Sequence, residues 1–207
     1  MSKIQTNQLQ HTANGAAVFT LPTSDGTNGQ VIKTNGSGVL SFVAQPDLST
    51  AGITMVDSWV LTTSFNASTA ADITSNWAKH SAASSAFGTI GTGMTQSSGI
   101  FTFPSTGIYM VHHTVGGRCH GSARPYMGIR QFVSTDSGSS YFRSHSGYSS
   151  GHTDGDHFSF SGTVIYDVTN ASTMRIKFNT EASASTTYFG NATNKNTGAV
   201  FIRLGDT

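Results

Sequence analysis

Four residues that can bind metals or act as nucleophiles gather in the stretch HHTVGGRCHG: His112, His113, Cys119 and His120. Cysteine and histidine together suggest a zinc site. The spacing argues against one, because His112 and His113 are neighbours on an expected strand and so face opposite sides. The chain has one cysteine, so we expect Cys119 to be free and buried. A symmetric trimer could still bring one histidine per chain to a metal on its axis.

A second candidate group lies in GHTDGDH, which places His152, Asp154 and Asp156 at alternating positions. On a strand these side chains would share a face, and in a loop they could surround a cation. Oxygen-rich loops suit calcium. Because two carboxylates are fewer than a dedicated calcium site uses, we interpret the segment as a solvated loop and expect no cofactor. The alternative is a calcium or other divalent metal site, which EDTA would reveal by lowering the melting temperature.

A third candidate group is aromatic and lies in the polar stretch STDSGSSYFRSHSGYSSGHTDGD. Its residues with contact-forming side chains are Tyr141, Arg143, His145 and Tyr148. Aromatic side chains with flexible Ser/Gly spacers form adaptable contact surfaces, and aromatic faces beside hydrogen-bond donors suit sugars. We therefore expect a long loop that contacts a ligand. The alternative is that Tyr141 and Phe142 begin another strand and are buried in the core.

Catalytic constellations are not evident in the sequence. No Gly-x-Ser-x-Gly elbow is present, and the 10 acidic residues are scattered without a carboxylate pair in an apolar setting. A Ser/His/Asp triad can be assembled on paper from any chain of this composition. We therefore expect a protein that is not an enzyme.

The composition favours strands and turns. Charged residues make up 10% of the chain, glycine counts 23, and much of the remainder is Ser, Thr and Asn, which is poor helix material. The net charge is +1 without a basic run, so we expect no nucleic-acid partner. The first residues, MSKIQTNQLQ, are polar and contain no apolar signal region. We expect synthesis in a cytoplasm and no membrane insertion.

From about residue 53 the chain shows many short apolar segments separated by turn-rich stretches, a pattern typical of a β-sandwich or barrel. The expected strands are Met55 to Thr62, Gly99 to Phe103, Gly107 to Val115, Tyr126 to Ser134, His157 to Tyr166, Thr173 to Asn179 and Ala199 to Leu204. Residues 64–89 and 134–156 are expected to be long polar loops.

The stretch GIFTFPSTGIYMV, residues 99–111, has the pattern Gly99-x-Phe101-x-x-Pro104-x-x-Gly107-x-Tyr109. We expect Phe101, Phe103, Ile108 and Tyr109 to point into a sandwich core, with Pro104 at a strand end and Gly107 where the chain reverses. The pattern resembles the central motif of the globular head of complement component one-q, a family that shares its jelly-roll fold with tumour necrosis factor. The closing apolar strand, Gly198 to Leu204, agrees. The resemblance implies an all-β, ten-stranded jelly-roll sandwich that forms a homotrimer.

The N-terminal part reads as a separate module. The segments Gln30 to Thr34 and Val39 to Val43 flank NGSG, a strong hairpin signal. A hairpin alone is marginal in water, so the module should be stable only when docked. The segment LPTSDGTNGQVIKTNGSGVLSFV resembles one near the N-termini of tail-fibre and other structural proteins of tailed phages, especially marine ones, with Asn35 and Phe42 in place of the usual Asp and Trp. We divide the chain into an attachment segment, residues 1–50, and a head domain, residues 51–207.

Together the two resemblances imply a phage virion protein. The first interpretation is a short trimeric fibre or tail adhesin whose head binds the host cell surface, with a glycan as the expected receptor. The alternative is a capsid decoration or head-fibre protein anchored to the shell by its N-terminus. Its expected partners are two further copies of the chain, other virion proteins and a host glycan or protein.

Overall fold

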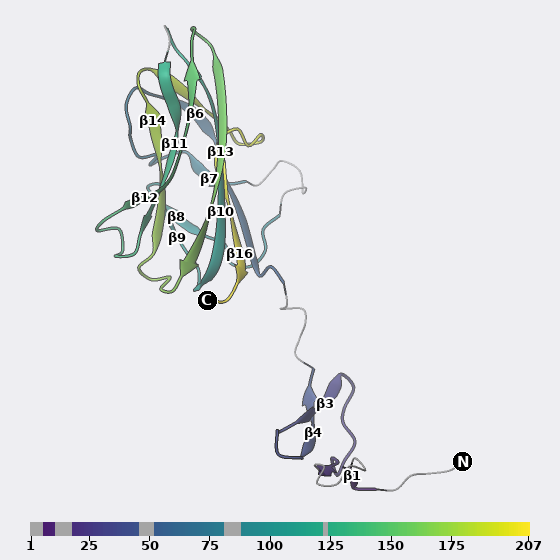
Figure 1. Cartoon of the computed structure of the whole chain (residues 1–207). Helices are drawn as coiled ribbons and strands as arrows, with labels where there is room; N and C mark the ends of the chain where they lie inside the picture. The colour runs from purple at the N-terminus through teal and green to yellow at the C-terminus, as the bar shows by residue number, and fades with distance from the viewer. Residues whose placement is uncertain (1–5, 11–17, 46–51, 81–87, 122–123) are drawn as a thin grey trace. The chain divides into compact units, whose positions relative to one another are not determined.

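The structure of the protein is a computed structural model that describes residues 6–10, 18–45, 52–80, 88–121 and 124–207. Every regular element in these residues is a β-strand, as the composition predicts (Figure 1). Within the described residues no helix is long and apolar enough to span a membrane. The chain divides into two compact units, residues 1–51 and 52–207, a boundary one residue from the expected one.

The N-terminal unit consists of two small antiparallel pairs. β1 (Gln8–Gln10) pairs with β2 (Val18–Thr20), and β3 (Gln30–Thr34) pairs with β4 (Leu40–Ala44). In the β3–β4 turn the Asn35 side-chain oxygen accepts hydrogen bonds from the backbone N–H groups of Ser37 (2.8 Å) and Val39 (3.1 Å). The NGSG segment therefore forms the expected hairpin, closed by an asparagine that organises its own turn.

The described residues of this unit form no core of their own. None of its described residues is fully buried. Its large exposed apolar side chains are Leu9, Val18, Phe19, Val31, Ile32 and Val39. Since two-stranded pairs are marginal alone, so much exposed apolar surface in a small unit indicates a surface that is normally covered.

The C-terminal unit, called the head below, is a sandwich of two antiparallel sheets. A seven-stranded sheet runs in the order β6-β15-β10-β16-β5-β7, with β13 also pairing with β10; a five-stranded sheet runs β12-β11-β14-β9-β8. The strands of the seven-stranded sheet are β5 (Met55–Leu61), β6 (Thr63–Ala67), β7 (Trp77–Lys79), β10 (Gly107–Cys119), β13 (His157–Val168), β15 (Thr186–Asn191) and β16 (Gly198–Gly205). Those of the five-stranded sheet are β8 (Thr95–Ser97), β9 (Ile100–Thr102), β11 (Arg124–Ser134), β12 (Phe142–Gly151) and β14 (Arg175–Ala182).

The head core lies between the sheets and is rich in aromatic rings. Phe101 is fully buried at its centre. Four rings surround it at centroid distances of 5.2–5.8 Å: Trp59, Trp77, Phe178 and Phe201. The contacts with Trp59, Trp77 and Phe178 are edge-to-face, a geometry that aromatic pairs prefer.

The GIFTFPSTGIYMV stretch forms β9, a turn and the start of β10, and its role is structural. Phe103 and Tyr109 are buried with ring centroids 4.8 Å apart, and the Tyr109 hydroxyl donates to the Ser105 carbonyl (3.1 Å). Gly107 has φ +140°, and a Cβ there would lie 2.5 Å from the Gly205 carbonyl oxygen. Ile108 was expected in the core and instead faces outward, because neighbours on a strand cannot both face inward.

The expected strands all exist, but the two expected long loops are wrong in part. Residues 134–156 contain β12, the ten-residue edge strand of the five-stranded sheet. Residues 64–89 contain all of β6 except Thr63 and all of β7. β15 and β8 were also not expected. The sheets therefore hold more than the implied ten strands, chiefly through the short strands β6, β7 and β8 at sheet edges.

Candidate functional site

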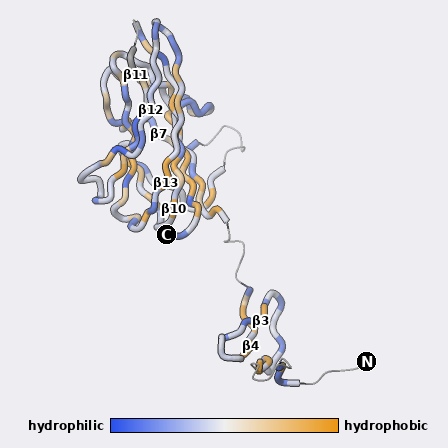
Figure 2. The backbone as a smooth tube through the Cα atoms, in the orientation of Figure 1, coloured by the Kyte–Doolittle hydropathy of each residue, from blue (hydrophilic) through white to orange (hydrophobic). Residues whose placement is uncertain are grey.

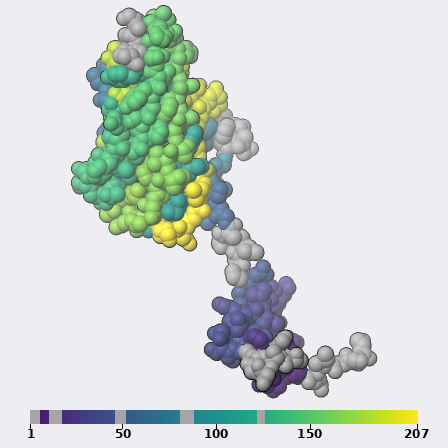
Figure 3. Space-filling view, in the orientation of Figure 1, coloured from purple at the N-terminus to yellow at the C-terminus, as the bar shows by residue number. Residues whose placement is uncertain are grey.

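The outward face of the seven-stranded sheet carries an apolar row. Strand register aligns Ile165 of β13, Met110 of β10, Ile202 of β16 and Val56 of β5 across four neighbouring strands. Ile90 continues the row through a two-bond bridge to Val56. Ile165 is 54% exposed, so this row lies outside the sandwich core. Figure 2 shows the hydrophobic colouring on β10 and β13, and Figure 3 shows β13, β10 and β16 exposed near the C-terminus.

The next row on the same face is mixed. It runs Thr163, His112, Val200 and Ser58, and the His112 Nδ1 lies 2.9 Å from the Thr163 hydroxyl. His112 and His113 therefore face opposite sides of β10, as expected. His112 lies on the outward face beside the apolar row, where a partner molecule can reach it.

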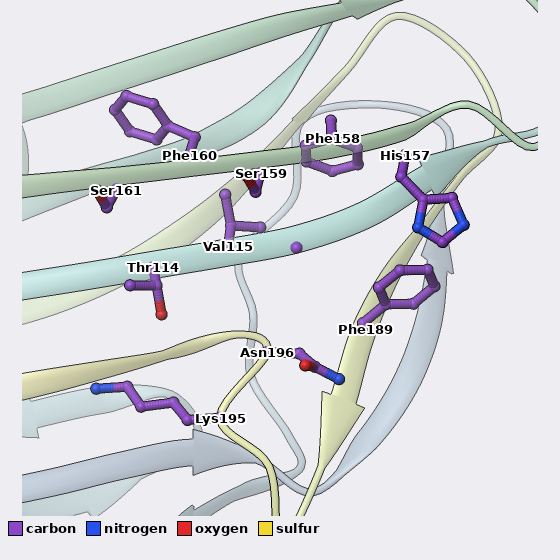
Figure 4. Close-up of a pocket in the computed structure, with 11 residues that line it drawn as sticks. Thr114, Val115, His157, Phe158, Ser159, Phe160, Ser161, Phe189, Lys195 and Asn196 are labelled. Atoms are coloured by element: carbon purple, nitrogen blue, oxygen red, sulfur yellow. The ribbon is translucent and has the colours of Figure 1, made fainter.

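Farther along this face an open pocket of about 970 Å³ is mostly polar (Figure 4). Residues that line it include Thr114, His157, Ser159, Phe189, Lys195 and Asn196. The His157 and Phe189 rings meet at 5.3 Å. Burial lowers the pKa of Lys195 to about 8, because the low-dielectric surroundings disfavour the ammonium. Among the described residues Lys195 has no carboxylate partner.

Inside the sandwich a polar network links the two sheets. His113 Nδ1 lies 2.8 Å from the Gln131 side-chain oxygen, and the Gln131 amide nitrogen donates to the Tyr166 hydroxyl at 2.8 Å. Ser144 Oγ lies 2.5 Å from the Tyr166 hydroxyl and donates to the Gln131 carbonyl. Desolvation lowers the pKa of His113 to about 4. His113 is thus a neutral structural residue, which the HHTVGGRCHG motif alone does not reveal.

The structure distributes the four expected ligand-contacting residues over different environments. Tyr141 lies under the Lys177 ammonium, 4.1 Å from the ring centroid, and burial raises the pKa of its hydroxyl. His145 faces inward, with its ring stacked on Phe160 at 5.5 Å. Arg143 is exposed on β12, and Tyr148 is 49% exposed farther along the same strand. They do not form one surface, and His145 belongs to the interior.

Tyr148 instead joins residues that the sequence did not single out. With Tyr126, Arg130 and Glu181 it lines a hollow of about 460 Å³ on the outward face of the five-stranded sheet. The Tyr126 and Tyr148 rings are 6.2 Å apart and edge-to-face, and Arg130 pairs with Glu181. The sequence pattern predicted a loop over the residues that form β12. It therefore could not predict that pairing of β12 with β11 places Tyr148 near Tyr126.

The residues expected as weak metal candidates do not converge. The Asp156 carboxylate accepts hydrogen bonds from the backbone N–H groups of His152 (2.7 Å) and Thr153 (2.9 Å), and these bonds lower the pKa of Asp156. Asp154 accepts from the Gly121 N–H (2.7 Å). In the described parts of the chain no group of three or more His, Cys, Asp or Glu side chains could hold a metal ion. Cys119 is buried and free, as expected.

Comparison with known proteins identifies the fold. No protein-family model and no curated protein matches the sequence. The solved structure of Eiger, a tumour necrosis factor from S. frugiperda, matches with a TM-score of 0.57 and 11% identity over 75% of this chain and 95% of that chain. Murine APRIL at pH 5.0 matches with a TM-score of 0.50 and 16% identity over 72% of this chain and 98% of that chain. The head therefore has the expected jelly-roll fold, of the tumour-necrosis-factor type.

Proposed function

We propose that this chain is a homotrimeric, non-enzymatic virion protein of a tailed phage. Its heads form a short fibre or tail adhesin that binds the host cell surface, with a glycan as receptor. Its N-terminal unit attaches the trimer to another virion protein. The observation that carries the proposal is the apolar row on the outward face of the seven-stranded sheet.

The apolar row supports assembly because it lies outside the core of its own chain, with Ile165 exposed. An antiparallel sheet with one solvated face is expected to alternate apolar inward and polar outward residues. Here Ile165, Met110, Ile202 and Val56 align on the outer side. The centre of a protein interface is depleted of charge, and this row contains no charged residue.

Further copies of the same chain are the occupants that best fit this face. The resemblance to the complement one-q head implies a trimer, and the jelly-roll fold of the head supports that expectation. A closed symmetric trimer buries the row in each copy without leaving an open edge for further growth.

The N-terminal unit supports attachment for a similar reason. Its described residues expose six large apolar side chains and include no fully buried residue. Its sequence resembles the N-terminal segments of tail-fibre and other phage structural proteins. A docked position on a virion protein would cover this surface and supply the stability that two-stranded pairs lack.

The location of the chain on the particle tests the virion and adhesin parts together. Gold-labelled antibody against the chain, applied to purified phage that encodes it, should decorate the tail or fibre tips. Purified chain should also reduce phage adsorption to the host when added first. Decoration of the capsid shell, with no effect on adsorption, would replace the adhesin with the capsid-decoration alternative, and unlabelled particles would refute the virion role.

A further inference from the structure

We propose that the hollow lined by Tyr126, Tyr148, Arg130 and Glu181 on the five-stranded sheet binds a neutral pyranose. This inference rests on the proposed adhesin function and assigns its ligand class and contact residues. The hollow lies on the opposite layer of the sandwich from the apolar row. A trimer that buries the row therefore leaves the hollow open to a cell surface.

The shape of the hollow follows from a glycine in the strand register. Gly128 of β11 lies between Tyr148 of β12 and Glu181 of β14, so all three share one face of the sheet. A Cβ on Gly128 would lie 1.8 Å from the Gly147 carbonyl oxygen, so this position admits no side chain. The buried Tyr188 hydroxyl donates to the Gly128 carbonyl at 3.0 Å, so a hydrogen bond from the core side fixes the backbone at the base of the hollow. The missing side chain leaves a depression with an aromatic wall.

The aromatic wall consists of two tyrosines that stay exposed. Tyr126 is 41% exposed and Tyr148 49%, although their rings meet edge-to-face at 6.2 Å. Aromatic rings present a negative face, against which the weakly positive C–H groups of a pyranose ring can pack. Held on neighbouring strands, these rings lose little conformational freedom when a ligand binds, since each side chain has two rotatable bonds.

The polar side of the hollow is an ion pair with unused hydrogen-bonding capacity. The Glu181 side chain is 6% exposed and pairs with Arg130. Within the parts of the chain that the structure describes, Glu181 is the one ion-pair partner of the Arg130 guanidinium, which carries five N–H donors. Vicinal hydroxyls of a sugar both donate and accept, so they can take hydrogen bonds from the guanidinium and give one to the carboxylate. A small number of placed polar groups beside aromatic walls is typical of a small-molecule site.

The charge balance of the hollow selects a neutral sugar. Arg130 and Glu181 form an ion pair, so their charges compensate each other. An acidic sugar would bring its carboxylate close to Glu181 and an amino sugar its ammonium close to Arg130, and each like-charge contact is costly in a partly desolvated site. A neutral pyranose avoids both contacts.

The test measures saturation transfer by NMR from the full-length protein to methyl glycosides of glucose, galactose, mannose and N-acetylglucosamine. The sugars are used at about 10 mM, because single-sugar contacts lie at the millimolar end of the affinity scale. We expect transfer to at least one glycoside, weakened by about tenfold or more in Tyr148→Ala and in Tyr126→Ala. Tyr148→Phe keeps the ring and should retain binding. Phe142→Ala, which removes a 64% exposed aromatic from the same strand outside the hollow, is the matched control.

Two results would overturn the inference. One is the absence of transfer to any of the four glycosides; the other is transfer that both tyrosine-to-alanine variants retain.

Adsorption of phage carrying the same variants separates this inference from the proposed function. If wild-type chain still blocks adsorption while the hollow binds no pyranose, the adhesin stands and another surface or a protein receptor replaces the hollow. If glycosides bind as expected but adsorption is unaffected, the hollow stands and the adhesin role falls.

Discussion

At the scale of single residues, the burial of His113 makes the stability of the head depend on pH. His113 is fully buried between the sheets, and its Nε2 has no partner among the described residues. Protonation would place a second N–H on the ring with nothing to accept it. This geometry agrees with a pKa lowered to about 4 by desolvation.

The first prediction is that stability falls as His113 is forced to ionise. The unfolded chain binds a proton near pH 6.5 and the folded chain near pH 4, so the unfolded state holds more protons between these values. Unfolding free energy should therefore decrease as pH drops through this window, by about 3 kcal/mol from His113. Urea unfolding of wild type and His113→Asn, which keeps a donor toward Gln131, measures the difference.

Exposed His152 supplies the control for this prediction. His152→Asn should leave the wild-type pH dependence unchanged, because its side chain is solvated in both states. If His113→Asn loses as much stability between pH 6.5 and 4 as wild type does, His113 is not the responsible group.

A second residue-scale prediction concerns the turn before β10. Gly107→Ala should destabilise the head by about 1–3 kcal/mol, because alanine is strained at φ +140° and its Cβ would approach the Gly205 carbonyl to 2.5 Å. Thermal unfolding measures the loss. Gly205→Ala, where a Cβ meets nothing within 4 Å, should change the melting temperature little; equal losses in both variants would contradict the steric account.

At the scale of elements, β12 explains what the sequence could and could not predict. The strands with clear apolar alternation, such as β10 and β13, were predicted because their inward residues are large. The inward positions of β12 include Gly147 and Gly151, and a Cβ at Gly147 would lie 1.7 Å from the Phe160 ring of β13. The side chain that fills this part of the core is therefore Phe160 of β13. Because β12 places glycines there, its sequence shows no apolar alternation.

The candidate site was harder to predict for the same reason. Tyr148 was singled out for its type, but its neighbours Tyr126, Arg130 and Glu181 come from β11 and β14. Only the register of three strands brings them together. His145 shows the converse: its type suggested a contact residue, while its position opposite Gln131 turns it inward.

The close fit of β12 against β13 gives the third prediction. Gly147→Ala should destabilise the head by about 3 kcal/mol through overpacking against Phe160. The double variant Gly147→Ala/Phe160→Ala should be less destabilised than the sum of the single variants by at least about 1 kcal/mol. Chemical unfolding measures the cycle, with the exposed Ser150→Ala of β12 as control. Strict additivity would show that the two positions do not compete for space.

At the scale of the whole molecule, the chain combines a head that has a core with an N-terminal unit whose described residues form none. The head holds an extensive buried aromatic cluster, whereas the described part of the N-terminal unit contains no fully buried residue. Stability should therefore reside in the head. We expect a chain that starts at Gly52 to melt within about 2 °C of the full chain by calorimetry. A large fall in melting temperature would mean that the head depends on the N-terminal unit.

The molar mass of the full chain in solution tests the central claim most directly. Light scattering after size-exclusion chromatography should give three times the 21.7 kDa of one chain. Ile165→Asp places a carboxylate in the exposed apolar row, so it should reduce the mass to that of one chain while the fold persists by circular dichroism. Phe142→Asp, on the other sheet, should remain trimeric. A wild-type mass of one chain, or a trimer that Ile165→Asp leaves intact, would contradict the account.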